Sequence, residues 1–145
     1  MKIFIGSSAE QKAYLDLIAS WIESSGHEPV LWNDSNVFPP GSYILSSLVK
    51  IAKTVEAAVF IFSEDDTLWY RKAKIKQPRD NVIFEYGVFL GILGKERVIF
   101  CRDGKPKPAS DILGVVYIDI SKGNLAKAKL IMLAWIESLE LVKKH

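Results

Sequence analysis

Five short apolar runs, separated by segments with helical spacing, constrain the fold of this chain most. They lie at residues 3–5, 28–32, 57–62, 98–100 and 115–118. The run at 57–62 is continuous rather than alternating, which is typical of a strand buried on both faces of a parallel sheet. Regular alternation of such strands with helices favours an α/β fold, in which helices cover both faces of one sheet.

The first and last helices are predicted from capping residues and from apolar spacing. Ser8 and Gln11 fit a capping box, and the helix that they open is expected to reach about Ser25, just before Gly26. Its apolar face consists of Tyr14, Leu17, Ile18, Trp21 and Ile22. The last helix is expected over about 125–142.

Two further helices and a loop are expected in the middle of the chain. Ser42 caps the second helix, and a third begins near Asp80. The residues of the second helix expected to face inward are Ile44, Leu45, Leu48, Ile51 and Ala52. The polar segment 63–79 is predicted to be a long loop, and long loops are usually functional or mobile.

These elements predict one topology and one position for a ligand. Right-handed crossovers favour a flavodoxin-like order 2-1-3-4-5 for the five-stranded parallel sheet. Neither a repeat nor a linker is evident, so residues 1–145 are interpreted as a single domain. In such sheets ligands bind beyond the C-terminal strand ends, where strands one and three diverge.

The end of the first strand is suited to a phosphate, and two aromatic residues to a planar ring. Gly6 allows close backbone approach, and Ser7 and Ser8 offer amide and hydroxyl donors at a helix N-terminus. The alternative is that Ser8 merely caps the helix. Trp32 and Phe38 are candidates for stacking on a ring, or else belong to the core or to an interface.

Polar residues also follow the third strand and precede the third helix. Ser63 and Asp65 are candidate binding residues, although Asp65 and Asp66 equally fit a solvated loop. Arg79 and Asp80 either contact substrate or simply pair and start the helix. No metal is expected, because two adjacent carboxylates lack the further oxygen ligands of a calcium or magnesium site.

Glu85 is the charged residue that most needs an explanation. It lies within the first two turns of an otherwise apolar helix, and an isolated buried ion is costly. Glu85 therefore has a partner such as Arg79 or a backbone amide, faces water in a cleft, or takes part in chemistry. The N-terminal half of this helix is expected beside the crevice.

Composition excludes several classes of protein. Of 145 residues, 49% are hydrophobic and 25% charged, which indicates a globular chain. The net charge of +2 gives no reason to expect nucleic-acid binding. The single cysteine, Cys101, excludes an internal disulfide and is expected in the core. Because no apolar run could span a bilayer, a soluble, cytoplasmic protein is expected.

The sequence resembles the TIR-like domains of bacterial anti-phage defence effectors, which are found alone or fused to cyclic-nucleotide sensors. The similarity covers nearly the whole chain. The segment 78–87, which includes Asn81, is similar to the family's catalytic helix, except that Tyr86 stands where many relatives carry Leu. The other matching segments are IFIGSS at 3–8, FPPG at 38–41 and FSEDD at 62–66.

This resemblance implies a TIR domain that cleaves NAD⁺ as a substrate, with Glu85 catalytic and no cofactor. It implies self-association through the loop at 33–41, and a cyclic-nucleotide sensor domain or protein as partner. It leaves open the activating signal and the form of the ADP-ribose product. Two other interpretations remain: a nucleoside 2-deoxyribosyltransferase-like enzyme, and a TIR scaffold that assembles without turnover. His27 precedes a strand at the opposite edge of the sheet, so a nucleophilic triad is not expected.

Overall fold

The structure is a computed structural model of the chain. At residues 44, 66–70, 73–77, 80 and 81 only the backbone is described. The residues described are 1–7, 11–33, 44–63, 66–70, 73–77, 80–103 and 117–144.

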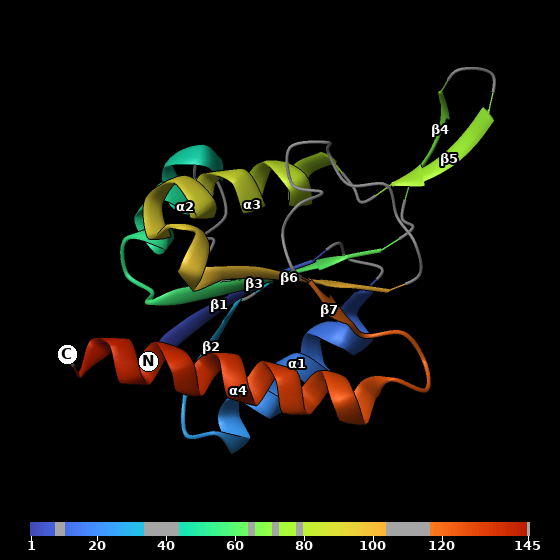
Figure 1. The fold of residues 1–145 in the computed structure, drawn as a ribbon. Coiled ribbons are helices and arrows are strands. Elements are labelled where there is room, and N and C mark those ends of the chain that lie inside the picture. The colour runs from blue at the N-terminus through green and yellow to red at the C-terminus, as the bar shows by residue number, and fades with distance from the viewer. Residues whose placement is uncertain are drawn as a thin grey trace.

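A sheet of five parallel strands forms the centre of the described part of the chain (Figure 1). Its strands, in spatial order, are β2 (Glu28–Leu31), β1 (Lys2–Gly6), β3 (Ala57–Phe62), β6 (Val98–Arg102) and β7 (Ile118–Asp119). When only the strands of this sheet are counted, β6 is the fourth in the chain and β7 the fifth. The spatial order is then 2-1-3-4-5, so the predicted flavodoxin-like topology is confirmed.

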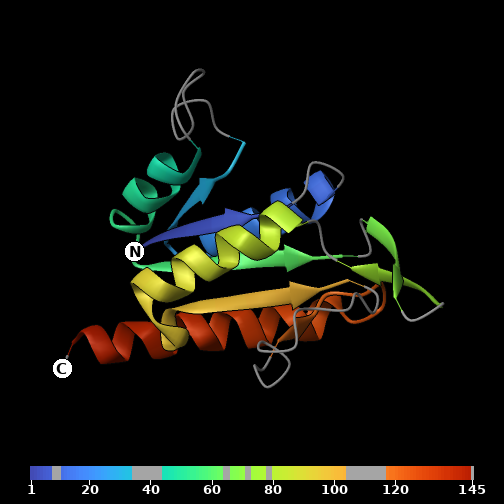
Figure 2. The ribbon, with the colours of Figure 1, turned by 90° about the horizontal axis from the view of Figure 1, so that it is seen from above.

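Two layers of helices cover the sheet. On one face lie α1 (Lys12–Ser24) and α4 (Leu125–Lys143), and on the other α2 (Ile44–Ala52) and α3 (Asp80–Leu93) (Figures 1 and 2). A short 3-10 helix, η2 (Lys95–Arg97), precedes β6. Successive strand residues point to opposite faces, so β3 supplies Val59 and Ile61 to the α1/α4 core and Phe60 and Phe62 to the α2/α3 core.

The four predicted helices are confirmed, with one residue misplaced, and the cap predicted at Ser42 lies outside the described residues. Helix α1 begins at Lys12, and Gln11 before it makes no side-chain cap hydrogen bond, while Ser8 lies outside the described residues. Leu45 was expected to face inward but is 54% exposed. It lies in the first turn of a nine-residue helix, and burial begins only at Leu48, one turn later.

The prediction of a long loop at 63–79 is wrong. Residues Asp66–Tyr70 form β4 and Ala73–Gln77 form β5, an antiparallel hairpin in which Leu68 pairs with Ile75. Figure 2 shows this hairpin projecting beyond the C-terminal ends of β3 and β6. In β5 the lysines alternate with apolar residues, and a period of two is the pattern of a strand.

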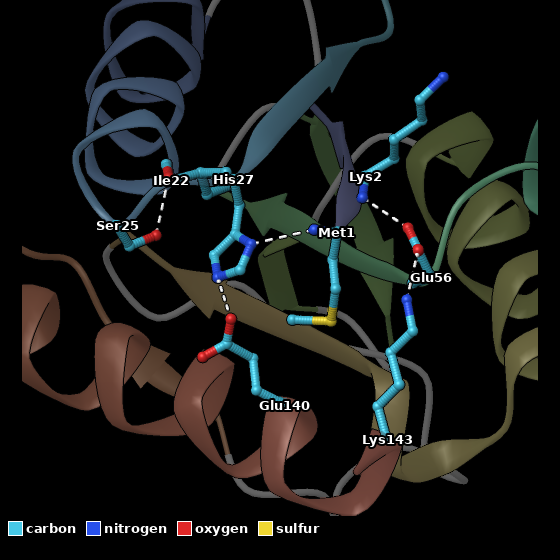
Figure 3. A network of polar contacts seen from close by, with 8 residues as sticks. All are labelled: Met1, Lys2, Ile22, Ser25, His27, Glu56, Glu140 and Lys143. Atoms are coloured by element: carbon cyan, nitrogen blue, oxygen red, sulfur yellow. Dashed lines mark hydrogen bonds and ion pairs between the residues drawn. The ribbon is translucent and has the colours of Figure 1, made fainter.

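A polar network fastens the end of α4 to the N-terminal edge of the sheet (Figure 3). The amino group of Met1 donates to Nδ1 of His27 at 3.0 Å, and Nε2 of His27 lies 3.1 Å from the Glu140 carboxylate. An ammonium group cannot accept, so in the neutral imidazole the proton is on Nε2. This contact gives His27 a structural role at the edge of the sheet where the sequence placed it.

Glu56 makes a second connection in the same network. Its carboxylate accepts from the backbone amide of Lys2 and from Nζ of Lys143, at 2.5 and 3.0 Å (Figure 3). These two bonds keep the pKa of the Glu56 carboxyl group below its usual value, and the bond from the Lys2 amide has the larger effect. Cys101 is completely buried in the core, as expected, and burial raises the pKa of its thiol.

Candidate active site at the C-terminal edge of the sheet

The side of α3 that carries Glu85 can be located from three buried residues of the same helix, Val82, Tyr86 and Phe89. Successive helical residues advance by about 100°, so Glu85 and Tyr86 lie on opposite sides of Val82. Phe89, on the Glu85 side, stacks on Phe4 of β1 with centroids 4.4 Å apart. Tyr86 instead contacts rings of β3 and β6. Glu85 therefore lies on the flank that faces β1.

The Glu85 carboxyl group is desolvated without a partner among the described residues. Glu85 is partly buried, and this burial raises the pKa of its carboxyl group from 4.5 to about 7. The described residues offer it neither a hydrogen bond nor an ion pair, and Arg79 lies outside them. A partly exposed, desolvated carboxylate is typical of catalytic sites, because perturbed pKa values concentrate there.

Ser7 and Trp32 meet where β1 and β2 end. Trp32 Nε1 donates to Ser7 Oγ at 2.9 Å, and Ser7 is only 5% exposed. The Trp32 ring packs against both hydrophobic cores. Trp32 thus stabilises the end of β1. The structure therefore supports a role for Trp32 in the core more than a role in stacking on the ring of a ligand.

The structure gives Gly6 a packing role. A Cβ at this position would lie 2.6 Å from Cε1 and 2.7 Å from Cδ1 of Phe60. The aromatic ring therefore occupies the space that a side chain at Gly6 would need. The prediction of close approach by a ligand at Gly6 stays a prediction.

Two buried hydroxyl groups near the site have unused hydrogen-bonding capacity. Ser63 follows β3 and is 2% exposed, and Tyr86 is 1% exposed. Within the described part of the chain, neither Ser63 Oγ nor the Tyr86 hydroxyl has a hydrogen-bond partner. Burying a donor without a partner costs about 1–3 kcal/mol, so both groups are candidates for contact with a ligand. The sequence analysis did not single out the Tyr86 hydroxyl group, because position 86 fits the apolar pattern of the helix.

The structure places part of the predicted site. Gly6, Ser7, Trp32 and Ser63 lie at the ends of adjacent strands, and Glu85 lies on the helix above them. Asp80 and Asn81 begin α3, with only their backbone described. The remaining predicted residues lie outside the described ones: Ser8, Phe38, Asp65 and Arg79.

One further residue at this edge, Arg102, was not singled out from the sequence. Arg102 ends β6. The rule that ligands bind beyond C-terminal strand ends would have pointed to Arg102. Among the described residues no cluster of histidine, cysteine, aspartate or glutamate could hold a metal ion.

The chain matches a known protein family over most of its length. A family model described as the TIR domain of the CAP12/Pycsar effector proteins matches residues 2–122. The chain belongs to this TIR-domain family. The predicted resemblance to TIR-like domains of bacterial effectors is thereby confirmed.

Curated members of the TIR-domain family are similar in sequence. CD-NTase-associated protein 12 of Lachnospiraceae bacterium (strain RUG226) is 35% identical over 114 residues, which are 79% of this chain and 35% of that protein. The Pycsar effector protein BcPycTIR of Burkholderia cepacia is 34% identical over 120 residues, 81% of this chain and 39% of that protein. This TIR domain therefore spans less than half the length of these relatives.

A solved structure supports the fold of the TIR domain. It is described as a 2-deoxyribosyltransferase from Bacillus psychrosaccharolyticus, and it matches with a TM-score of 0.57 and 17% identity, over 88% of this chain and 96% of that one. At this identity the likeness concerns the fold. No helix within the described ranges is both long and apolar enough to cross a membrane.

Proposed function

We propose that this TIR domain cleaves NAD⁺ at the bond between nicotinamide and ribose, with Glu85 as the catalytic residue. The observation that carries the proposal is the position and state of Glu85: a desolvated carboxyl group with no partner among the described residues, beside the C-terminal ends of a parallel sheet. Such edges are where ligands bind in this class of sheet.

The chemistry of NAD⁺ suits a single carboxylate. Nicotinamide leaves as a neutral molecule, so the reaction needs no general acid. Positive charge builds up on the ribose in the transition state, and a fixed carboxylate nearby stabilises it. Hydrolysis of an ordinary glycoside, which has a poorer leaving group, usually requires two carboxyl groups.

The rest of the site would hold the substrate in place. Ser7 lies at the end of β1, where amide and hydroxyl donors can meet a phosphate. Ser63 and Tyr86 would offer their hydroxyl groups, which have no hydrogen-bond partner among the described residues, to polar atoms of the bound nucleotide. Ser8, Phe38, Asp65, Arg79, Asp80 and Asn81 remain proposed binding residues.

We also propose that activity depends on assembly and on a signal. Self-association through the loop at 33–41 would raise turnover more steeply than in proportion to protein concentration. The relatives are named as CD-NTase-associated and Pycsar effector proteins, so a cyclic-nucleotide sensor domain or protein, acting in anti-phage defence, is the proposed partner.

The decisive experiment measures nicotinamide release by mass spectrometry at several protein concentrations, for wild type and for Glu85→Gln. Glu137→Gln is a matched control, because Glu137 lies exposed on α4. We expect release by wild type and by the control, and loss of at least a hundredfold in Glu85→Gln, the scale of removing a main electrostatic group. Retained turnover in Glu85→Gln would exclude the catalytic role.

A separate incubation with a deoxynucleoside and a free base, run beside this experiment, separates the two alternatives. A deoxyribosyltransferase-like enzyme would instead exchange bases when given a deoxynucleoside and a free base. A scaffold would assemble with concentration and release no nicotinamide at any concentration.

A further inference from the structure

The hairpin of β4 and β5 forms a small sheet of its own. Its strands, Asp66–Tyr70 and Ala73–Gln77, pair with each other and, among the described residues, with no other strand. Both ribbon views show the hairpin beyond the edge of the main sheet (Figures 1 and 2). An isolated two-stranded hairpin is only marginally stable in water, and further strands stabilise it. The hairpin is therefore suited to gain a neighbouring strand.

The two edges of the hairpin differ in composition. Within the described part of the chain both strands are edge strands, and an edge strand presents backbone N–H and C=O groups to an incoming strand. β5 contains Lys74 and Lys76, and lysine on an edge strand discourages further pairing. β4 contains no lysine, and its Thr67, Trp69 and Tyr70 are of types that favour strands. The edge suited to an added strand is therefore that of β4.

A second copy of β4 fits this edge in an antiparallel pairing about a two-fold axis. Full overlap of the two strands places Leu68 opposite Leu68 of the second copy. Thr67 then lies opposite Trp69, and Asp66 lies opposite Tyr70. No two like charges are opposed, so β4 is complementary to itself in this register.

The outer edge of β5 does not suit the same arrangement. Two copies of β5 would place Ile75 opposite Ile75 and each Lys74 opposite a Lys76. Like charges directly opposite each other destabilise a sheet. Pairing through β4 is thus favoured over pairing through β5.

We propose that two copies of this chain join through β4, so that their hairpins form one four-stranded antiparallel sheet. The new ladder pairs the outward backbone groups of β4 in both copies. β5 then lies at both edges, where its lysines discourage further addition, so the contact closes as a two-fold dimer. This surface is separate from the loop at 33–41, and the proposal does not rest on NAD⁺ cleavage. Because β5 ends at Gln77 and α3 begins at Asp80, the contact lies next to the start of the helix that carries Glu85.

The direct test is cysteine cross-linking of the 145-residue chain. Opposed residues of an antiparallel pair have Cα atoms about 4.5–5.5 Å apart, a separation that a disulfide can span. Leu68→Cys should form a disulfide-linked dimer on addition of oxidised glutathione, seen by mass and reversed by a reductant. Ile75→Cys is the matched control and should stay monomeric, because Ile75 pairs with Leu68 within the hairpin but belongs to the other edge. The native Cys101 is completely buried and should not cross-link.

Sedimentation over a range of concentrations measures the dimer without a cross-link. Leu68→Lys opposes two like charges at the two-fold axis, so its dimer should be weaker than that of Ile75→Lys by about fivefold or more, the scale of one cross-strand pair. Both variants place one lysine in the same pair of the hairpin, and association through the loop at 33–41 would be common to both. Thermal unfolding confirms that each variant folds.

Two results would overturn the proposal. One is equal cross-linking by Leu68→Cys and Ile75→Cys, or none by Leu68→Cys at the highest soluble concentration, which would show that a second copy does not occupy the β4 edge. The other is equal dimerisation of the two lysine variants. Neither result depends on turnover, so failure of the proposed function would appear separately, as a cross-linked dimer that releases no nicotinamide.

Discussion

Replacing Glu85 by glutamine should stabilise the protein at neutral pH while abolishing its proposed activity. Burial raises the pKa of Glu85 from 4.5 to about 7, and each pKa unit corresponds to about 1.36 kcal/mol. The ionised carboxylate therefore costs the folded state about 3 kcal/mol above pH 7, an upper limit for a group that retains some contact with water. Glutamine has no charge, so its contribution does not vary with pH.

The sign of the pH dependence follows from proton linkage. Between pH 4.5 and 7 the folded chain keeps the Glu85 proton and the unfolded chain has lost it, so rising pH favours unfolding. The contribution of protonated Glu85 is complete below pH 4.5 and is lost as the pH rises through 7. The stability of Glu85→Gln relative to wild type should therefore increase over this interval and level off above it.

The assay is urea unfolding of wild type, Glu85→Gln and the exposed control Glu137→Gln, each from pH 5 to pH 8. We expect the difference in unfolding free energy between Glu85→Gln and wild type to grow by about 2–3 kcal/mol, and the difference for Glu137→Gln to stay flat. Parallel curves for Glu85→Gln and wild type would refute the reasoning, because they would show that Glu85 ionises at an ordinary pH in the folded chain.

Three further predictions follow from particular contacts. If ionised Glu85 stabilises the transition state, kcat/KM for NAD⁺ should rise with pH and level off above about 7, and a rate that falls through this range would indicate an acid role instead. Gly6→Ala should cost about 1–3 kcal/mol by overpacking against Phe60, measured by urea unfolding. Gly87→Ala, where a Cβ meets nothing within 4 Å, should gain up to about 1 kcal/mol from helix propensity, and equal effects at the two glycines would contradict this contrast. Glu56→Gln should cost less than about 1 kcal/mol at pH 7 and nothing well below pH 4.5, because a lowered pKa adds stability that is lost on acidification; a cost that persists in acid would show that the charge is not its source.

Much of the fold could be predicted because local patterns and chain-wide rules agree. The continuous apolar run of β3 required burial on both faces, and the right-handed crossover rule left few strand orders. The hairpin of β4 and β5 was not predicted, because the alternation of polar and apolar residues in its strands is short and the polar residues of β5 include two lysines. Leu45 was misplaced because helical spacing says which side a residue is on, and not how far the neighbouring layer extends.

The sequence alone determined which strand ends would carry polar residues and that Glu85 would interrupt an apolar helix. Such facts depend on residue order, which the parallel topology converts into position. Only the tertiary structure decided that Glu85 faces β1, that Phe60 fills the space above Gly6, and that the hydroxyl groups of Ser63 and Tyr86 lack partners among the described residues. It also brought Tyr117 onto the ring of Phe100, seventeen residues earlier in the chain. These are outcomes of packing between distant segments, and no local pattern encodes the distance or the angle at which two side chains meet.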